Sequence, residues 1–513
     1  MEGVLSNCGV VDSGSGQAKL YNEADTHKPS LLDNCQKEDI GEDSEAMGGR
    51  GGRRGDRQAE PLLRKLSGSS SDNSSEEHPV KRTGTVWTAM AHVITAVIGS
   101  GVLSLAWSVA QLGWVGGPAA MVLFAGVTVV QSSLLADCYI SRDPERGAAV
   151  RNRSYVDAIR LYLGKKSQML SGFFLGFSLF GNSVVYTLTA AASMRAIERA
   201  NCYHREGQGA PCCAAGAGGS SEAYYMLLFG VAQVALSQIP DFHSMAWLSV
   251  FAAVMSFFYS FIGFGLGAAK VIENGVIKGG IGGVSLVSPT QKVWRVAQAL
   301  GDIAFAYPFS LVLLEIEDTL RSPPAESQTM KRAARASIAV TTFFYLGCGC
   351  FGYAAFGDGT PGNLLTGFGD PYWLVGLANL CVVLHLLGGY QVYAQPMFAL
   401  VERRFGAGVV DAEMPLLGRV SVSRLCFRTA NVATATAVAV WFPYFNQVVG
   451  LIGAFTFWPL AIHFPVQMYL AQGKVAPWTG RWLAIQAFSA GCLVACGFAS
   501  VGSAMGVFGP ERS

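Results

Sequence analysis

The sequence carries little charge. Only 14% of its 513 residues are Asp, Glu, Lys or Arg, against about 25% in an average soluble chain. The acidic residues are also unevenly placed, since 15 of the 35 lie in residues 1–85 and only 20 in the 428 residues that follow. That second stretch is rich in Leu, Val, Ala, Phe and Gly and contains repeated apolar runs of about 20 residues, the length of a helix that crosses a ~30 Å hydrocarbon core. The composition therefore excludes an ordinary soluble protein and indicates an all-α polytopic membrane protein.

The sequence also lacks features that several functional classes require. The formal net charge of +2 gives no field that would attract nucleic acid, and 12 cysteines in so long a chain exclude a disulfide scaffold. The sequence lacks the HExxH, GxxxxGK[ST] and GxSxG motifs of metalloproteases, P-loop proteins and serine hydrolases. We therefore expect no enzyme activity, no catalytic residues, no metal site and no bound cofactor.

The first 80 residues have the composition of a disordered tail. They include GGRGGRRG at 48–55 and a run of Ser, Asp, Asn and Gly at 67–75, which bury too little apolar area to offset the entropy of the chain. Their basic residues would suit anionic lipid, but interleaved acids favour a solvated tail. The start lacks the basic and apolar regions of a signal peptide. The expected organisation is a cytoplasmic tail over 1–80, a transmembrane domain over 81–508 and a short extracellular C-terminus over 509–513.

The apolar runs predict about 11 transmembrane helices. Their approximate limits are 86–110, 113–139, 168–198, 223–240, 244–270, 293–315, 335–356, 372–400, 425–442, 446–470 and 480–506. If the N-terminus is cytoplasmic, 29 of the 37 Lys and Arg residues fall on the inner side. Because cytoplasmic loops of membrane proteins are enriched in basic residues, we expect a multi-pass protein with its N-terminus cytoplasmic and its C-terminus extracellular.

Two of these apolar runs contain helix-breaking residues near their middle. The first holds Gly99-Ser100-Gly101, and the sixth holds Pro308, which removes a backbone N–H and clashes with the preceding turn. Glycine and proline are common in membrane helices for packing or kinks alone. Broken helices in corresponding positions of two halves, however, are typical of a transporter binding site. The first and sixth spans lie five helices apart, so we expect the site between them.

Several long stretches of the sequence resemble plant-type amino acid permeases, a branch of the amino acid/auxin permease group in the APC superfamily. The matching stretches are 81–114 (KRTGTVWTAMAHVITAVIGSGVLSLAWSVAQLGW), 134–139 (LLADCY), 237–242 (SQIPDF), 273–279 (ENGVIKG), 299–310 (ALGDIAFAYPFS), 361–369 (PGNLLTGFG), 388–396 (GGYQVYAQP) and 448–460 (VVGLIGAFTFWPL). The resemblance implies a LeuT-type fold of inverted five-helix repeats plus one extra helix. It also implies proton-coupled uptake of amino acids, usually at the plasma membrane.

The resemblance carries two further expectations. Cys202 follows Asn201 and Cys212 follows Pro211, as the two loop cysteines of the family do, which implies a disulfide between them; Cys213 could replace Cys212 or stay free. The chain also departs from the family at Asn182 and Val185 in the third span, where apolar residues or glycine are usual. If this span lines the pocket, the broad substrate range of the family is in doubt.

The expected substrate site follows from the two breaks. A helix N-terminus at Gly99, Ser100 and Gly101 would bind the substrate carboxylate through free N–H groups. Freed carbonyl groups near Ala304, Phe305 and Ala306 would bind the ammonium group, beside Tyr307. Tyr186 and Phe305 are candidates for the walls around the substrate side chain, with simple packing as the alternative.

Asp302 is the candidate for carrying the coupling proton. It lies seven residues, or about 10 Å of helix, below Arg295 at the outer end of its span, and an ionised Asp there costs about 2.5–3.5 kcal/mol. The alternative is a structural carboxylate that caps the broken helix or pairs with Arg295 or with a partner helix. His92 and His385 are expected to be neutral packing residues. The acids near the inner ends of spans, namely Asp137, Glu315 and Glu317, are expected at the interface or in gating.

These observations predict a proton-coupled amino acid symporter with protons as the coupling ion and an amino acid and membrane lipids as its partners. One alternative is transport of auxin, proline or another amine-bearing metabolite. Another is a membrane sensor that binds amino acids without accumulating them. The sequence leaves the oligomeric state open.

Overall fold

The computed structural model describes residues 82–142, 149–207, 221–238, 246–285, 288–405, 411–414 and 418–508. The chain divides into two compact units, Met1–Asp56 and Arg57–Ser513, and all described residues lie in the second. The expected tail over 1–80 and the C-terminal residues 509–513 lie outside the described residues.

The first half of the described chain consists of helices joined by one small hairpin. In order these are α1 (Val86–Val97), α2 (Gly101–Asp137), β1 (Ile140–Arg142), β2 (Ala149–Arg151), α3 (Tyr155–Glu206), α4 (Glu222–Ser237) and α5 (Ala246–Asn274). A capping box begins α1, in which the Thr85 hydroxyl accepts from the Thr88 N–H and the Thr88 hydroxyl accepts from the Thr85 N–H. The strands β1 and β2 pair in antiparallel register, with Ile140 opposite Arg151.

The second half of the described chain is also mainly helical. Its elements are α6 (Pro289–Ala306), α7 (Ser310–Asp318), α8 (Glu326–Phe356), η4 (Gly357–Gly359), η5 (Leu364–Gly367), α9 (Tyr372–Phe405), β3 (Asp411–Met414), β4 (Gly418–Ser421), α10 (Val422–Trp441), α11 (Phe445–Thr456), η6 (Phe457–His463), α12 (Phe464–Gln472) and α13 (Gly480–Phe508). In the described residues strands form only the two hairpins, so the prediction of an all-α polytopic membrane protein is confirmed.

Each of the eleven predicted spans has a helical counterpart. Among the described residues, eight helical segments are long and apolar enough to cross a membrane. One of them, α2, contains the end of the first span and the second span, because Gly113 has a φ of 78° and divides the helix. A side chain there would collide with the backbone, since a Cβ would lie 2.1 Å from the Ile281 carbonyl oxygen. Gly164 divides α3 in the same way, separating a short first segment from the long span.

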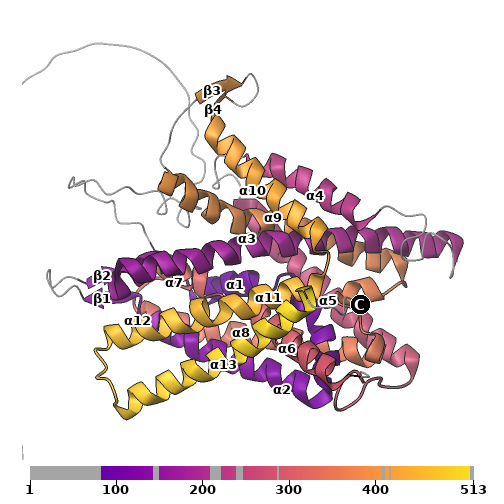
Figure 1. The fold of residues 1–513 in the computed structure, drawn as a ribbon, viewed down its shortest axis with the longest axis horizontal. Coiled ribbons are helices and arrows are strands. Elements are labelled where there is room, and N and C mark those ends of the chain that lie inside the picture. The colour runs from indigo at the N-terminus through magenta and orange to yellow at the C-terminus, as the bar shows by residue number, and fades with distance from the viewer. Residues whose placement is uncertain are drawn as a thin grey trace, which may run out of the picture. The chain divides into compact units, whose positions relative to one another are not determined.

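The central helices differ from the peripheral ones in burial. In the α6–α7 pair 67% of the most apolar window is buried, and in α11–α12 the share is 72%, whereas in α13 it is 28%. In Figure 1, α3 runs between a group that contains α4, α9 and α10 and a group that contains α1, α2, α8 and α11. The helix α6 packs against both α2 and α11, and α7 packs against α1, α2 and α3, which places both halves of the broken sixth span in the middle of the protein.

Small residues let α6 and α11 approach closely. A Cβ on Gly301 would lie 2.4 Å from the Gly450 carbonyl oxygen, and a Cβ on Gly453 would lie 2.3 Å from the Gly301 carbonyl oxygen. Glycines at such an interface allow the backbones of two membrane helices to touch. The position of α6, and with it the second helix break, is therefore determined by direct backbone contact with α11.

Candidate functional site

The first helix break separates α1 from α2. Helical structure stops after Val97, and α2 begins at Gly101, with Ile98, Gly99 and Ser100 between them. Ser100 is the N-cap of α2, but its hydroxyl makes no capping bond and, although buried, has no hydrogen-bond partner among the described residues. Because the first N–H groups of a helix have no partner within it, this N-terminus presents free donors beside a free hydroxyl.

The second break separates α6 from α7. Tyr307, Pro308 and Phe309 lie between Ala306 and Ser310. The two breaks touch, because a Cβ added to Gly101 would lie 3.0 Å from both Cα and Cβ of Ala306. Glycine at 101 is therefore what lets the start of α2 lie against the end of α6.

Two tyrosine hydroxyls lie against carbonyl groups at the breaks. Tyr345 of α8 lies with its Oη 2.8 Å from the carbonyl oxygens of both Val97 and Ala306. Tyr259 of α5 donates to the Gly99 carbonyl oxygen at 2.9 Å. Since a hydroxyl has one proton, Tyr345 can donate to only one of its two carbonyls at a time.

A small cavity opens between the breaks, where the space between its walls, open solvent included, is about 310 Å³. It is bordered by residues of both broken spans, α3 and α9. These residues are Ala96, Val97, Gly99, Ser100, Gly101, Asn182, Tyr186, Phe305, Ala306, Pro308 and Tyr393.

Most of the residues expected at the substrate site line this cavity. They are Gly99, Ser100, Gly101, Tyr186, Phe305 and Ala306. Ala304 and Tyr307 do not. Ala304 is buried within the packing of α6, and the Tyr307 ring packs on Tyr345 with its hydroxyl 3.4 Å from Thr342 Oγ1. The side chains of consecutive residues point in different directions around a helix end, so a contiguous stretch of sequence cannot line one cavity.

Four lining residues were not expected from the sequence, namely Ala96, Val97, Pro308 and Tyr393. Tyr393 lies in the GGYQVYAQP stretch of α9, so the family resemblance was the available signal for it. Its ring meets Tyr186 edge to face, with centroids 5.7 Å apart. Asn182 lines the cavity, whereas its neighbour Val185 is fully buried and is not among the lining residues.

Asp302 lies outside the cavity lining but only one helical turn before Ala306. The carboxyl is fully buried. Asn446 Nδ2 donates to its Oδ2 at 2.8 Å, Ser108 Oγ lies 3.5 Å from the same oxygen, and Oδ1 has no hydrogen-bond partner among the described residues. Its hydrogen-bond partners among the described residues are thus neutral groups, and Arg295, one of the expected alternatives, is not among them.

The two histidines differ in position. His385 Nδ1 lies 2.8 Å from the Ala252 carbonyl oxygen. Since a carbonyl only accepts, Nδ1 carries a proton, and Nε2 has no hydrogen-bond partner among the described residues. His385 is therefore a buried, hydrogen-bonded packing histidine, as expected, and its neutral state stays a prediction. His92 is exposed on α1, so the expectation that it packs inside the protein is wrong, because its side chain faces away from the neighbouring helices.

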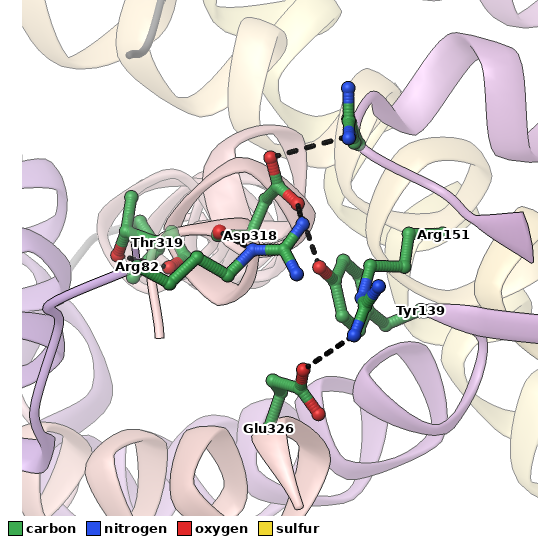
Figure 2. A network of polar contacts seen from close by, with 8 residues as sticks. Arg82, Tyr139, Arg151, Asp318, Thr319 and Glu326 are labelled. Carbon is green, nitrogen blue, oxygen red and sulfur yellow. Dashed lines mark hydrogen bonds and ion pairs between the residues drawn. The ribbon is translucent and has the colours of Figure 1, made fainter. Parts of the chain in front are cut away.

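A polar network joins the far ends of α1 and α7 (Figure 2). Arg82 Nη2 donates to Asp318 Oδ1 at 2.7 Å, and Arg82 Nε donates to the Asp318 carbonyl oxygen at 2.9 Å. Tyr139 Oη also donates to Oδ1 at 2.7 Å, and Arg153 Nε lies 3.6 Å from Oδ2. Burial, with the hydrogen bond to Asp318, raises the pKa of Tyr139, so its hydroxyl keeps the proton it donates.

Further pairs surround this network. Arg151 meets Glu326 at 3.3 Å, and Lys331 meets Asp137 at 2.5 Å. Among the acids expected near inner helix ends, Asp137 is thus paired, Glu315 is partly buried, and Glu317 is buried with no hydrogen-bond partner for either oxygen in the described part of the chain.

Cys202, at the end of α3, forms a disulfide. The seven other cysteines that the structure describes are free, so the partner of Cys202 lies outside the described residues. The expected partner, Cys212, and its neighbour Cys213 are both in that undescribed part.

The polar network in which Arg82, Tyr139 and Arg153 meet Asp318 is expected to close its end of the protein. We expect Asp318→Asn to loosen that end. Asn cannot carry the charge that Arg82 and Arg153 meet, and hydrogen bonds to charged groups stabilise by about 1.5–3 kcal/mol. Ala96→Cys, which lines the cavity, should then react roughly tenfold faster with an impermeant thiol reagent applied from the Asp318 side. The matched control is Glu273→Gln, which removes the exposed partner of Lys270. Equal labelling of both variants would contradict a closing role for the network.

Sequence comparison identifies a family and several relatives that this chain resembles. Residues 82–508 match the sequence model of the family described as "Transmembrane amino acid transporter protein". The chain is 54% identical to "Probable amino acid permease 7" of Arabidopsis thaliana, covering 84% of this chain and 94% of that one. It is 52% identical to "Amino acid permease 3" of the same plant, covering 83% and 91%, and 31% identical to "Lysine histidine transporter-like 6", covering 78% and 86%.

Comparison with solved structures gives a weaker likeness. The crystal structure of MhsT in complex with L-phenylalanine aligns with a TM-score of 0.44 and 12% identity, over 81% of this chain and 98% of that one. The sequence matches are the stronger result, since one family spans nearly all the described residues and relatives above 50% identity cover most of both chains. The chain belongs to the family of transmembrane amino acid transporter proteins.

Proposed function

We propose that this transporter imports amino acids across the plasma membrane by proton symport. The observation that carries the proposal is the cavity between the two helix breaks, where an uncapped helix N-terminus and the unpartnered Ser100 hydroxyl border a space of about 310 Å³. Free N–H donors at a positive dipole end suit a carboxylate, the group that all amino acids share.

The ammonium group of the substrate would bind at the same breaks. A carbonyl oxygen has two lone pairs, so the Val97 and Ala306 carbonyls, each already near the Tyr345 hydroxyl, can accept a second donor. The carboxylate would lie at Gly99–Gly101 and the ammonium group beside it. The substrate side chain would then extend toward Tyr186, Phe305 and Tyr393, which also line the cavity.

Asp302 is the group that we propose to carry the coupling proton. It is fully buried, and its hydrogen-bond partners among the described residues are the neutral Asn446 and Ser108. Burying an unpaired carboxylate is costly, and protonation removes the charge. Since Asp302 precedes Ala306 by one turn of α6, a change in its charge acts on the same helix that borders the substrate.

Uptake of labelled amino acids by cells expressing the chain tests this function. Uptake should rise when the external pH is lowered and should lead to accumulation against a gradient. A sensor would bind amino acid without accumulating it, and a carrier coupled to another ion would accumulate it without a proton requirement.

We expect Gly101→Val to abolish uptake while the protein still reaches the membrane. A branched side chain at 101 would overlap Ala306, from which a Cβ alone is 3.0 Å distant, and would fill the position of the carboxylate. Gly126→Val in the same helix is the control, because a Cβ there meets nothing within 4 Å. Normal substrate affinity in Gly101→Val would place the site elsewhere.

Asp302→Asn should remove the stimulation of uptake by external acid, since the near-isosteric amide cannot take up and release the proton. We expect the acid-stimulated current to fall by roughly tenfold, equivalent to ~1.4 kcal/mol, at matched surface expression. Glu317→Gln makes the same change at another buried carboxyl, in α7 of the same broken span, and should keep the pH dependence. Loss of pH dependence in Glu317→Gln but not in Asp302→Asn would exclude Asp302 as the coupling group.

The proposed orientation has residue 60 in the cytoplasm and residue 510 outside. It follows from the concentration of 29 of the 37 basic residues on one side of the membrane. Protease added to intact cells should digest a tag at residue 510 and spare a tag at residue 60, and the reverse pattern would refute the orientation.

A further inference from the structure

The lining of the cavity is uncharged. Within the described part of the chain, its polar side chains are Ser100, Tyr186, Tyr393 and Asn182, and its other lining residues are apolar or glycine. An acidic substrate side chain would find no cation there and a basic one no carboxylate. Since an unpaired charge is costly away from water, the cavity suits a neutral substrate side chain.

Asn182 adds an amide that can form hydrogen bonds to this uncharged lining. Its Nδ2 donates to the Ser178 carbonyl oxygen, one turn earlier in α3, at 2.7 Å. A carbonyl cannot donate, so this bond fixes which end of the amide is nitrogen. The carbonyl oxygen Oδ1 is then an acceptor only, and it makes no hydrogen bond with any residue that the structure describes.

The spacing along α3 relates Asn182 to the backbone breaks. Tyr186 lies beside the first break, because a Cβ on Gly99 would be 3.5 Å from its hydroxyl. Asn182 is four residues away on the same face of α3, a rise of about 6 Å. A substrate whose carboxylate and ammonium groups lie at the breaks would need only a side chain of a few bonds to span that distance.

We propose that Asn182 Oδ1 accepts a hydrogen bond from the side chain of the substrate. The transporter then prefers neutral amino acids whose side chain donates, namely those with an amide or a hydroxyl group, over apolar side chains of the same size. The proposal rests on the amino acid transport proposed above and adds the residue that selects among substrates.

Asn379 offers a matched comparison within the same protein. It lies in α9, is fully buried, and its Nδ2 donates to the Val375 carbonyl oxygen, again one turn earlier, at 3.0 Å. Its Oδ1 also lacks a hydrogen-bond partner among the described residues. Asn379 is not among the residues that line the cavity. The two asparagines thus share the local helix bond and differ in their access to substrate.

The test measures selectivity as a ratio within each variant, so that differences in surface expression cancel. The pairs are asparagine against leucine and threonine against valine, in which the two members have nearly the same shape. In the wild type we expect the member with the donor to be favoured by about tenfold in kcat/KM, the upper range for one neutral hydrogen bond.

Asn182→Leu should remove this preference or reverse it, and Asn379→Leu should keep the wild-type ratio. Asn182→Ala removes the acceptor without adding bulk and should shift the ratio in the same direction, which covers the case in which Asn182→Leu fails to fold. An unchanged ratio in the Asn182 variants, an equal shift in Asn379→Leu, or no preference in the wild type would each overturn the proposal. Failure of the wild type to take up any amino acid would instead refute the proposed function.

Discussion

The need to find partners for backbone groups at two helix breaks governs the centre of this protein. In hydrocarbon an unpaired N–H or C=O group costs several kcal/mol, and the breaks around Gly99 and Pro308 free such groups at mid-span. The Tyr345 hydroxyl lies 2.8 Å from both the Val97 and the Ala306 carbonyl oxygens, and its one proton can serve one of them at a time, while Tyr259 donates to Gly99. The N–H donors at the start of α2 have no side-chain cap. The breaks thus keep free N–H donors, which suit an anion, beside carbonyl groups that can still accept a donor.

Close packing of α6 against α11 connects the buried Asp302 carboxyl to this site. Gly301, Gly450 and Gly453 bring α6 and α11 into backbone contact, and Asp302 lies inside that contact. A Cβ on Gly450 would lie 2.9 Å from Asp302 Oδ1, so the carboxyl has little room to change its position when its charge changes. Because Asp302 and Ala306 are one turn apart on one rigid helix, a rearrangement around the carboxyl reaches the cavity through α6 without an intervening chain of side chains.

Local signals in the sequence account for what could be predicted. Gly99-Ser100-Gly101 and Pro308 mark helix breaks by themselves, so the spans, the breaks and the residues at them followed from composition and spacing. Tyr345 and Tyr393 could not be assigned that way, because α8 and α9 bring them to the breaks only through tertiary packing. Tyr307, expected at the substrate site, lies outside the cavity lining, since the direction of a side chain at a broken helix end depends on its neighbours, here Thr342 and Tyr345. His92 was misjudged for a similar reason, because a histidine in an apolar run can face either side of its helix.

The half-helices α1 and α7 are joined at both ends. At the breaks, Tyr345 lies between the last turn of α1 and the carbonyl of Ala306 just before α7. At the far end, the Gly84 N–H donates to the Thr319 carbonyl oxygen at 2.9 Å, the Arg321 N–H donates back to Gly84 at 3.0 Å, and Arg82 holds Asp318. Two segments fixed to each other at both ends move most readily as one body. We therefore expect access to the cavity from that side to require a shift of the pair against Tyr139 and Arg153, which hold Asp318 from the neighbouring hairpin region. The first span is thus divided at its break, since α2 presents free N–H donors at the cavity and α1 is held to α7 at its far end.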